Sequence, residues 1–515
     1  AQGLTDVVYL TIGTGVGAGV LSGGQLVHGM MHPEAGHILV TRDPRDTIGE
    51  HSGCPFHDNC LEGLIAGPGI KKRWDGKSAG DMADDPEAMD LLAGYLAQAL
   101  MTYTLCYAPQ KIIIGGGVSG LAAALAAAKE CGGQCVTVLE RLDRVGKKLL
   151  ATGNGRCNLT NRNAAPEHYH SADTARLADI LERTPPDAVL DFFGEMGLLC
   201  DTQADGRVYP YCYQASMVLD VLRAALERAG VDVACSCEVA EVEKGPGGFS
   251  VRTRDGRAFS AARVVLAAGG QAGPQFGTDG SAFALARMLG HSVAEPYPCL
   301  VPLRCAGFPV GLKGVRANCA LSLYLDGRCA GTERGEVQFA EYGLSGIPAM
   351  QLSCLLGPGV KKAGTSVDFF PEMAFPVLRG MLEQRCASGM FASLETLLLG
   401  LVAKKLGHAI LKSCGLQPLS RAPGSLSRRE VNALASALKN WRFAVEGTLP
   451  WTQAQVTGGG VPLAEVKTEG CASLRCPGLY LSGEVLDAAG DCGGFNLQWA
   501  WATGIAAGRA AARGL

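Results

Sequence analysis

The hydrophobic pattern is clearest over residues 111–140. Residues 112–114 are three isoleucines, residues 121–128 are only leucine and alanine, and residues 134–139 form a second, mostly apolar run. Short apolar runs bounded by glycine are typical of buried strands, whereas an unbroken leucine–alanine stretch is typical of a helix. This order predicts a strand, a helix and a second strand, which together make a βαβ unit.

Three glycines fill the turn between the first strand and the helix. Gly115, Gly117 and Gly120 have the spacing G-x-G-x-x-G, which permits a tight turn, the approach of phosphates and close helix–strand packing. Glu140 follows the second strand, twenty positions after Gly120, where a carboxylate can accept hydrogen bonds from a ribose. The glycine turn alone would also suit simple packing; with Glu140 it predicts a Rossmann-type dinucleotide site.

The rest of the chain alternates between helical and strand patterns. Helical spacing covers residues 174–198 and 214–229, and a strand at 263–268 ends in Gly269 and Gly270. Residues 300–370 look β-rich, and residues 374–440 carry Leu, Met and Ala at helical spacing. Because the last two stretches interrupt the nucleotide domain, they are predicted to be inserted domains that cover a substrate.

The chain closes with a strand that enters Gly483 and Glu484, followed by a small-residue helix after Gly494. Such a turn and helix start can present Asp487 and backbone N–H groups to a cofactor. Trp499 and Trp501 in this helix are better read as core residues than as a stacking platform.

Composition narrows the class of protein. A chain of 515 residues needs several domains, and its net charge of −3 gives no electrostatic reason to expect nucleic acid or a membrane surface as partner. No apolar run is long enough to span a membrane. The 20 cysteines are scattered through a large chain, which favours free thiols in a reducing cytoplasm.

Near the N-terminus, residues 7–21 read as two apolar strands joined by a glycine–threonine turn. The turn suits either a phosphate site or a plain β-hairpin. Downstream, Cys54, His57 and Cys60 form a C-x2-H-x2-C cluster, and His37 lies upstream. Two thiolates and two imidazoles suit tetrahedral zinc, with His51 as a rival to His37 for the fourth ligand position.

Residues 11–17, 32–37 and 51–63 together resemble the ROK family of sugar kinases, in particular its fructokinases, and the resemblance runs to about Gly117. It implies an incomplete actin-like lobe in which residues 13–17 face ATP phosphates, Glu34 and Glu62 face sugar hydroxyls, and the Cys/His cluster holds zinc. The family's N-terminal lobe, with its general base, has no counterpart here, so we expect this segment to be catalytically inert.

Residues 146–161 form a loop rich in glycine, asparagine and threonine, with Arg156 and two lysines. Such a loop is either a solvated turn region or a set of donors for a pyrophosphate or an isoalloxazine edge.

This loop, the glycine turn, the VTGGGV segment and the GEVLD and GGFNLQWAW endings together resemble the HI0933-like (BaiN-type) family of FAD-dependent oxidoreductases, over about residues 111–515. The resemblance implies FAD in an interrupted Rossmann domain, NAD(P)H as electron donor and a small-molecule substrate, with double-bond reduction among the activities of relatives. By motif position it implies FAD contacts at Gly115, Gly117, Gly120, Glu140, Thr152, Gly153, Asn154, Gly155, Arg156, Cys157, Asn158, Gly269, Gly270, Gly483, Glu484, Asp487, Asn496 and Leu497.

The predicted fold class is therefore α/β: a Rossmann-type FAD-binding domain interrupted by a β-rich and a helical domain, preceded by an incomplete kinase lobe. The expected bounds are 1–110 for the kinase segment, 111–300 and 450–515 for the FAD domain, 301–372 for the β-rich domain and 373–449 for the helical domain. Residues 111–118 satisfy both family patterns, which indicates a chimera joined at this strand.

Motif position does not identify a catalytic residue or exclude every alternative function. Cys157, Tyr209, Tyr211 and Glu484 are candidate acids by motif position alone, and none is assigned a catalytic role. The alternatives to an FAD-dependent oxidoreductase are a zinc-containing sugar kinase and a non-catalytic flavin- or sugar-sensing module. Neither the choice between NADH and NADPH nor the oligomeric state is predicted.

Overall fold

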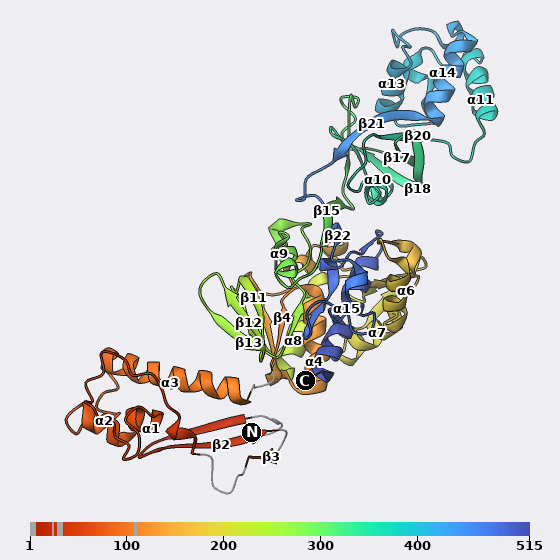
Figure 1. Cartoon of the computed structure of the whole chain (residues 1–515). Helices are drawn as coiled ribbons and strands as arrows, with labels where there is room; N and C mark the ends of the chain where they lie inside the picture. The colour runs from red at the N-terminus through yellow and green to blue at the C-terminus, as the bar shows by residue number, and fades with distance from the viewer. Residues whose placement is uncertain (1–6, 23–24, 28–33, 108–110, 515) are drawn as a thin grey trace.

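A five-stranded sheet organises the larger part of the molecule, shown in Figure 1 as a computed structural model in which residues 7–22, 25–27, 34–107 and 111–514 are described. Its strand order is β10-β5-β4-β14-β23, and every neighbouring pair is parallel. The strands are β4 (Ile112–Gly115), β5 (Val136–Leu139), β10 (Asp232–Ala234), β14 (Arg263–Leu266) and β23 (Leu479–Leu481). The predicted α/β class and Rossmann-type sheet are confirmed.

Alternating side chains on these strands build two hydrophobic layers. Ile112 and Ile114 face one core, whereas Ile113 between them faces the other. Val265 and its neighbour Leu266 divide in the same way. Because successive strand residues point to opposite faces, a strand covered on both faces needs the continuous apolar run seen in the sequence.

Helices cover one face of the sheet, and a small antiparallel sheet with a helix covers the other. The first layer contains α4 (Val118–Cys131), α8 (Ala215–Ala229) and α15 (Phe495–Arg513). The second contains α9 (Ser281–Met288) and strands β11 (Val239–Gly245), β12 (Gly248–Thr253) and β13 (Ala258–Ala261). Trp499 and Trp501 of α15 are buried, as the sequence predicts.

The helical pattern predicted over 174–198 is divided into α6 (Thr174–Arg183) and α7 (Pro186–Glu195). Pro185 and Pro186 separate them, because proline lacks an N–H donor and is tolerated only in the first turn of a helix. The smaller elements of this domain are α5 (Lys147–Leu150), β6 (Thr160–Asn161), β7 (Tyr169–His170), β8 (Cys200–Thr202), β9 (Arg207–Pro210), β15 (Ala294–Cys299), β22 (Val456–Gly460), β24 (Ala489–Gly490), η2 (Gly133–Cys135), η3 (Thr152–Gly155), η4 (Pro166–His168), η5 (Pro274–Phe276), η7 (Leu463–Glu465) and η8 (Gly483–Val485).

A closed six-stranded barrel occupies the interrupting region, at the opposite end of Figure 1 from the N-terminal segment. Its order is β16-β19-β18-β17-β20-β21. The strands are β16 (Leu303–Cys305), β17 (Val315–Leu325), β18 (Arg328–Phe339), β19 (Gly343–Ser345), β20 (Ala363–Asp368) and β21 (Trp441–Thr448), with α10 (Ile347–Ser353) packed against them.

The helical segment interrupts the barrel rather than following it. It contains α11 (Phe375–Ala387), α12 (Leu394–Leu397), α13 (Lys404–Ser413), η6 (Pro423–Ser425) and α14 (Arg428–Lys439). Residues 441–448, which the sequence analysis grouped with the helices, form β21 and pair with β16 and β20. Closing a barrel requires a partner for each edge strand, and β21 supplies it from beyond the helices.

The N-terminal segment has its own core, around Leu61, Leu64 and Tyr95. Its elements are β1 (Val7–Ile12), β2 (Val16–Ser22), β3 (Gln25–Leu26), η1 (Ala35–His37), α1 (Leu61–Ile65), α2 (Gly67–Arg73) and α3 (Pro86–Tyr107). β1 and β2 form the predicted antiparallel hairpin. Tyr9 and Phe56 are exposed, at 67% and 78% of their surface.

No helix in the described part of the chain has the length and apolar character needed to cross a membrane.

A buried ion pair holds the N-terminal segment together, and we expect Arg73→Ala to destabilise it strongly. Arg73 donates from Nε and Nη2 to the two Asp46 carboxylate oxygens at 2.6 and 2.9 Å, and both side chains are almost fully buried. Truncation leaves a buried, unpaired carboxylate, which costs about 3–5 kcal/mol. Hydrogen exchange of the α1 amides measures the loss.

The control is Arg45→Ala, because Arg45 pairs with Asp43 on the surface. An exposed pair contributes about 1 kcal/mol or less. Equal destabilisation by the two variants would show that burial of the Arg73 pair is not what stabilises this segment.

Candidate functional site

A cavity of about 910 Å³ opens at the carboxyl ends of β4, β5, β14 and β23. This edge is where an open parallel sheet binds its ligand, and the volume lies at the upper end of small-molecule sites. Thirteen of the residues predicted from motif position line it: Gly115, Gly117, Glu140, Thr152, Gly153, Asn154, Arg156, Asn158, Gly269, Gly483, Glu484, Asn496 and Leu497. The structure therefore brings together segments that are far apart in the sequence.

The other five predicted residues lie behind or beside this lining. Gly120 packs α4 against the glycine turn: a Cβ there would lie 1.7 Å from the Gly115 carbonyl oxygen. Cys157 is fully buried in the core, and burial raises the pKa of its thiol to about 12. Gly270 packs against Thr457, Gly155 is exposed, and the Asp487 carboxylate accepts a hydrogen bond from the Ala172 N–H at 3.3 Å.

Glu140 follows β5 and borders the cavity beside the glycine turn. Its Oε1 accepts a hydrogen bond from the Leu142 N–H at 2.9 Å, and burial raises the pKa of its carboxyl group. An acceptor held this way beside the glycine turn is suited to the hydroxyl groups of a ribose.

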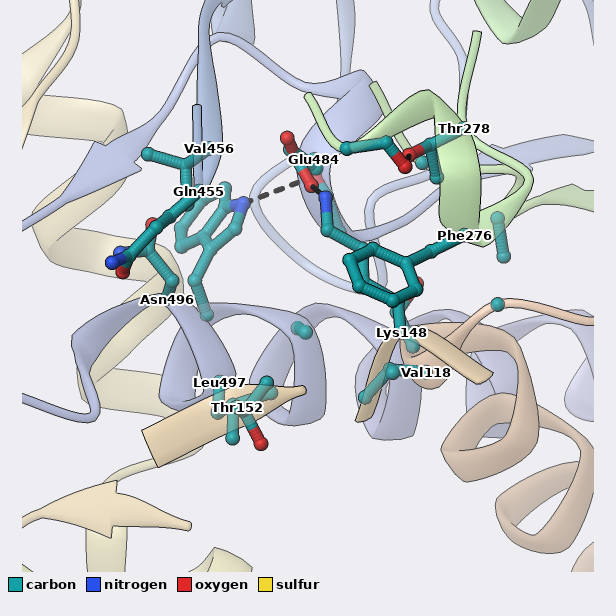
Figure 2. Close-up of a pocket in the computed structure, with 18 of the residues that line it drawn as sticks. Val118, Lys148, Thr152, Phe276, Thr278, Gln455, Val456, Glu484, Asn496 and Leu497 are labelled. Atoms are coloured by element: carbon teal, nitrogen blue, oxygen red, sulfur yellow. Dashed lines mark hydrogen bonds and ion pairs between the residues drawn. The ribbon is translucent and has the colours of Figure 1, made fainter. Parts of the chain in front are cut away.

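Glu484 is fixed by neighbours from two other segments. Its Oε1 accepts hydrogen bonds from the Thr457 N–H at 2.8 Å and the Thr457 hydroxyl at 2.7 Å, and its Oε2 pairs with Lys148 Nζ at 2.8 Å. Lys148 and Glu484 point toward one another in Figure 2. A carboxyl group with these three contacts is fixed in place, so its role is to join α5, β22 and η8 around the cavity.

Several lining residues have no motif that sequence reasoning could use. Phe276 and Thr278 come from η5 and the turn after it, and Gln455 immediately precedes β22 (Figure 2). Lys148 is one of the two lysines that the sequence analysis names as donors in the loop motif, but its pairing with the distant Glu484 has no sequence signal. Pairing signals of this kind are visible only in the fold.

Asn158 carries an unsatisfied polar atom. Its side chain lines the cavity and is buried, and its Oδ1 has no hydrogen-bond partner among the described residues. Buried acceptors without a partner are rare and point to a missing ligand or water. Together with the glycine turn and Glu140, this atom fits a dinucleotide cofactor rich in hydroxyl and N–H donors.

Of the four candidate acids, only Tyr209 and Glu484 line the cavity. Glu484 is anchored, and Cys157 lies in the core. Tyr211 is 65% exposed and does not border the cavity. The Arg156 guanidinium lies 5.4 Å from the centroid of the Tyr209 ring. Tyr209 is therefore the candidate that lines the cavity and is not held in an ion pair.

Two histidines flank Asp491 where β7 pairs with β24. His168 Nδ1 lies 3.3 Å from Asp491 Oδ2, and His170 Nε2 lies 3.2 Å from Asp491 Oδ1. His168 and Asp491 line the cavity. The hydrogen bond to Asp491 raises the pKa of His170.

The raised pKa predicts a pH-dependent stability. A histidine with a raised folded-state pKa stabilises the fold below its ordinary pKa, and this stabilisation is lost as pH rises through the folded-state pKa. We therefore expect the free energy of unfolding to fall as pH rises above the ordinary histidine pKa of about 6.5, and to fall less in His170→Asn. Urea denaturation at each pH measures the free energy of unfolding. His408→Asn is the control, and an unchanged pH slope in His170→Asn would contradict the assignment.

In the N-terminal segment the structure gathers the four predicted metal ligands. One ligand atom from each of His37, Cys54, His57 and Cys60 lies within 4.8 Å of the others. His37 Nδ1 is 3.7 Å from both sulfur atoms. Tetrahedral zinc bonds of about 2.0–2.3 Å imply ligand separations of about 3.5 Å, so the donor set fits zinc.

The rival ligand lies outside this group. His51 Nδ1 contacts Asp58 Oδ1 at 3.0 Å, and its side chain is largely exposed. Glu62, predicted to face a sugar, accepts a hydrogen bond from the Val16 N–H at 2.9 Å and lies 3.8 Å from His37 Nε2.

Comparison with known proteins gives separate matches for the flavin-binding region and for the N-terminal segment. A family model described as the HI0933-like protein Rossmann domain matches residues 109–510. A 3-dehydro-bile acid delta(4,6)-reductase of Clostridium scindens is 38% identical over 405 residues, which cover 78% of this chain and 98% of that protein. A ribosomal RNA dihydrouridine synthase of Haemophilus influenzae is 27% identical over 404 residues, which cover 77% and 97% of the two chains.

The ROK family model matches residues 1–141 and so overlaps the first match across β4 and α4. A putative fructokinase of Bacillus subtilis is 49% identical over 118 residues, which cover 23% of this chain and 38% of that protein. The chain thus spans about two fifths of that relative's length. From residue 109 onward, over a match that takes in the whole cavity, the chain belongs to the HI0933-like family.

Proposed function

We propose that the protein is an FAD-dependent oxidoreductase that reduces an activated carbon–carbon double bond with electrons from NAD(P)H. The observation that carries this proposal is the cavity at the carboxyl edge of the parallel sheet, where the glycine turn, Glu140 and the unpaired Asn158 oxygen converge. When bound, FAD would supply the two-electron chemistry, while the protein supplies binding, orientation and electrostatics.

Each part of the lining has a role in this proposal. The N–H groups at the start of α4 would hold the pyrophosphate, and Glu140 would accept hydrogen bonds from the ribose. The unpaired Asn158 Oδ1 would accept a hydrogen bond from the rest of the cofactor. The Lys148–Glu484 pair joins α5 to η8, so both walls keep their spacing.

The substrate side of the cavity is formed with the barrel. Ile347 and Gln351 of α10 line the same cavity as Leu300 and Val456. These mostly apolar side chains suit the body of a hydrophobic ring system. Tyr209 and His168 are the O–H and N–H groups that we propose hydrogen-bond a carbonyl conjugated to the double bond, where negative charge develops during reduction.

The relatives guide the choice of substrate. We extend to this chain the 3-oxo, steroid-like class that the name of the Clostridium scindens reductase indicates. Ribosomal RNA, which appears in the name of the Haemophilus influenzae relative, is the alternative. The net charge of −3 disfavours it, because RNA binding relies on clusters of positive charge.

The experiment is anaerobic flavin reduction and reoxidation. The purified chain should carry one FAD, be reduced by NADH or NADPH, and be reoxidised by an unsaturated 3-oxo steroid. Reoxidation by a uridine-containing ribosomal RNA fragment instead would assign the alternative substrate. A correctly folded chain that takes up no added FAD would overturn the proposal.

For the N-terminal segment we propose a zinc-stabilised fold without kinase activity, joined to the flavoprotein by recombination within residues 111–118. The clustered Cys/His donors and the overlap of the two family matches support this reading. ATP-dependent phosphorylation of fructose by the purified chain would contradict it.

A further inference from the structure

Two buried thiols lie together where the barrel meets the flavin domain. Cys299 ends β15, and Cys354 caps the C-terminus of α10. They are 0% and 2% exposed and share one apolar cluster with Leu300 and Val456. Within this cluster, β15 and the end of α10 pack against each other.

Contacts on both sides keep the two segments in register. The Tyr297 hydroxyl donates to the Cys354 carbonyl oxygen at 3.2 Å, and the Val301 N–H donates to the Ser353 hydroxyl at 3.1 Å. Cys299 lies between these two anchored positions in the sequence, so it is held against the end of α10. A disulfide joins Cα atoms about 4.4–6.8 Å apart, so it requires segments that are held in contact as these two are.

The pair lies directly behind the cavity wall. Leu300 and Val456 line the cavity, as does Cys492, which packs against the same cluster. The hydrogen bond with Cys299 lowers the pKa of Cys354, and the same contact raises the pKa of Cys299. Cys354 is therefore the better nucleophile, because the thiolate is the reactive form.

We propose that Cys299 and Cys354 are a redox-active pair that hydrogen peroxide converts into a disulfide. The Cys354 sulfur attacks one peroxide oxygen, the O–O bond breaks, and the released hydroxide leaves as water with the Cys354 thiol proton. The Cys299 sulfur then attacks the resulting sulfenic acid, forms the S–S bond and expels hydroxide, which leaves as a second water with the Cys299 proton. The two thiols lose two electrons, and peroxide is reduced to two waters.

The source of peroxide rests on the proposed function, since a reduced flavin held in this cavity would supply peroxide when oxygen oxidises it. The consequence is structural. The disulfide ties the end of α10 to β15, and α10 carries Ile347 and Gln351 of the cavity wall. Oxidation thus fixes the barrel side of the cavity.

The test treats the full chain with excess hydrogen peroxide and maps its peptides without reduction. We expect a Cys299–Cys354 cross-link, loss of two titratable thiols, reversal by dithiothreitol, and at least about fivefold slower hydrogen exchange of the α10 amides. Cys354→Ser and Cys299→Ala should each abolish both effects. The control Cys319→Ala removes another buried thiol and should retain them.

Absence of the cross-link, or a Cys354–Cys492 link in its place, overturns the assignment. Flavin absorbance of the same preparation reports on the proposed function separately. A colourless protein that forms the cross-link overturns FAD binding and supports the thiol pair, whereas a yellow protein without the cross-link overturns the pair alone.

Discussion

Gly117→Val should abolish flavin binding. A Cβ at this position would lie 2.4 Å from the Ala267 carbonyl oxygen, so the turn must move away from the end of β14. The added methyl groups would also stand where the pyrophosphate approaches the start of α4. We expect the FAD content to fall from about one per chain to below about one tenth, an affinity loss of a hundredfold or more, or about 3 kcal/mol. Absorbance of the desalted protein measures it.

Two variants show whether the effect is local. Gly117→Ala adds one carbon and should give an intermediate loss of affinity. Gly380→Ala in α11 meets no atom within 4 Å, so it should keep full flavin content and gain up to about 1 kcal/mol of stability. Full flavin content in Gly117→Val would remove the glycine turn from the proposed site.

The fold was predictable where local pattern and tertiary environment agree. The isoleucines of β4 are buried on both faces of the sheet, and such strands carry continuous apolar runs that a sequence displays directly. The barrel was harder to predict from the sequence. β21 lies after four helices in the sequence but pairs with β16 and β20, and no local signal identifies a partner so distant.

The residues of the site also fall into those that the sequence could predict and those that it could not. Glycines and Glu140 are identified by spacing, because phosphate and ribose impose fixed positions after a strand. Phe276 lines the cavity and Lys148 pairs there with Glu484 through long-range packing, so no spacing rule contains these contacts. Cys157 and Asp487 show the converse: they belong to motif segments, but their side chains face the core and the Ala172 backbone instead of the cavity.

Cys54→Ser should remove zinc from the N-terminal segment and unfold it. Cys54 is one of four donors in a cluster where each ligand atom lies close to the other three. The segment's core is small and includes Leu61, which directly follows the ligand Cys60, and structural zinc contributes folding free energy directly. We expect bound zinc to fall from about one to below about one tenth per chain. Elemental analysis measures the metal, and hydrogen exchange of the α1 amides measures the unfolding.

His51→Ala is the matched control. His51 lies three residues before Cys54 and is the rival for the fourth ligand position. Its ring, however, pairs with Asp58 outside the cluster. It should keep its zinc, and His37→Ala should lose it. The flavin content should be unchanged in all three variants, since the zinc cluster and the flavin cavity share no residue. Zinc that survives Cys54→Ser but is lost in His51→Ala would reassign the ligands. Flavin that disappears together with zinc would show that the two parts of the chain fold as one unit, which the recombination proposal does not allow.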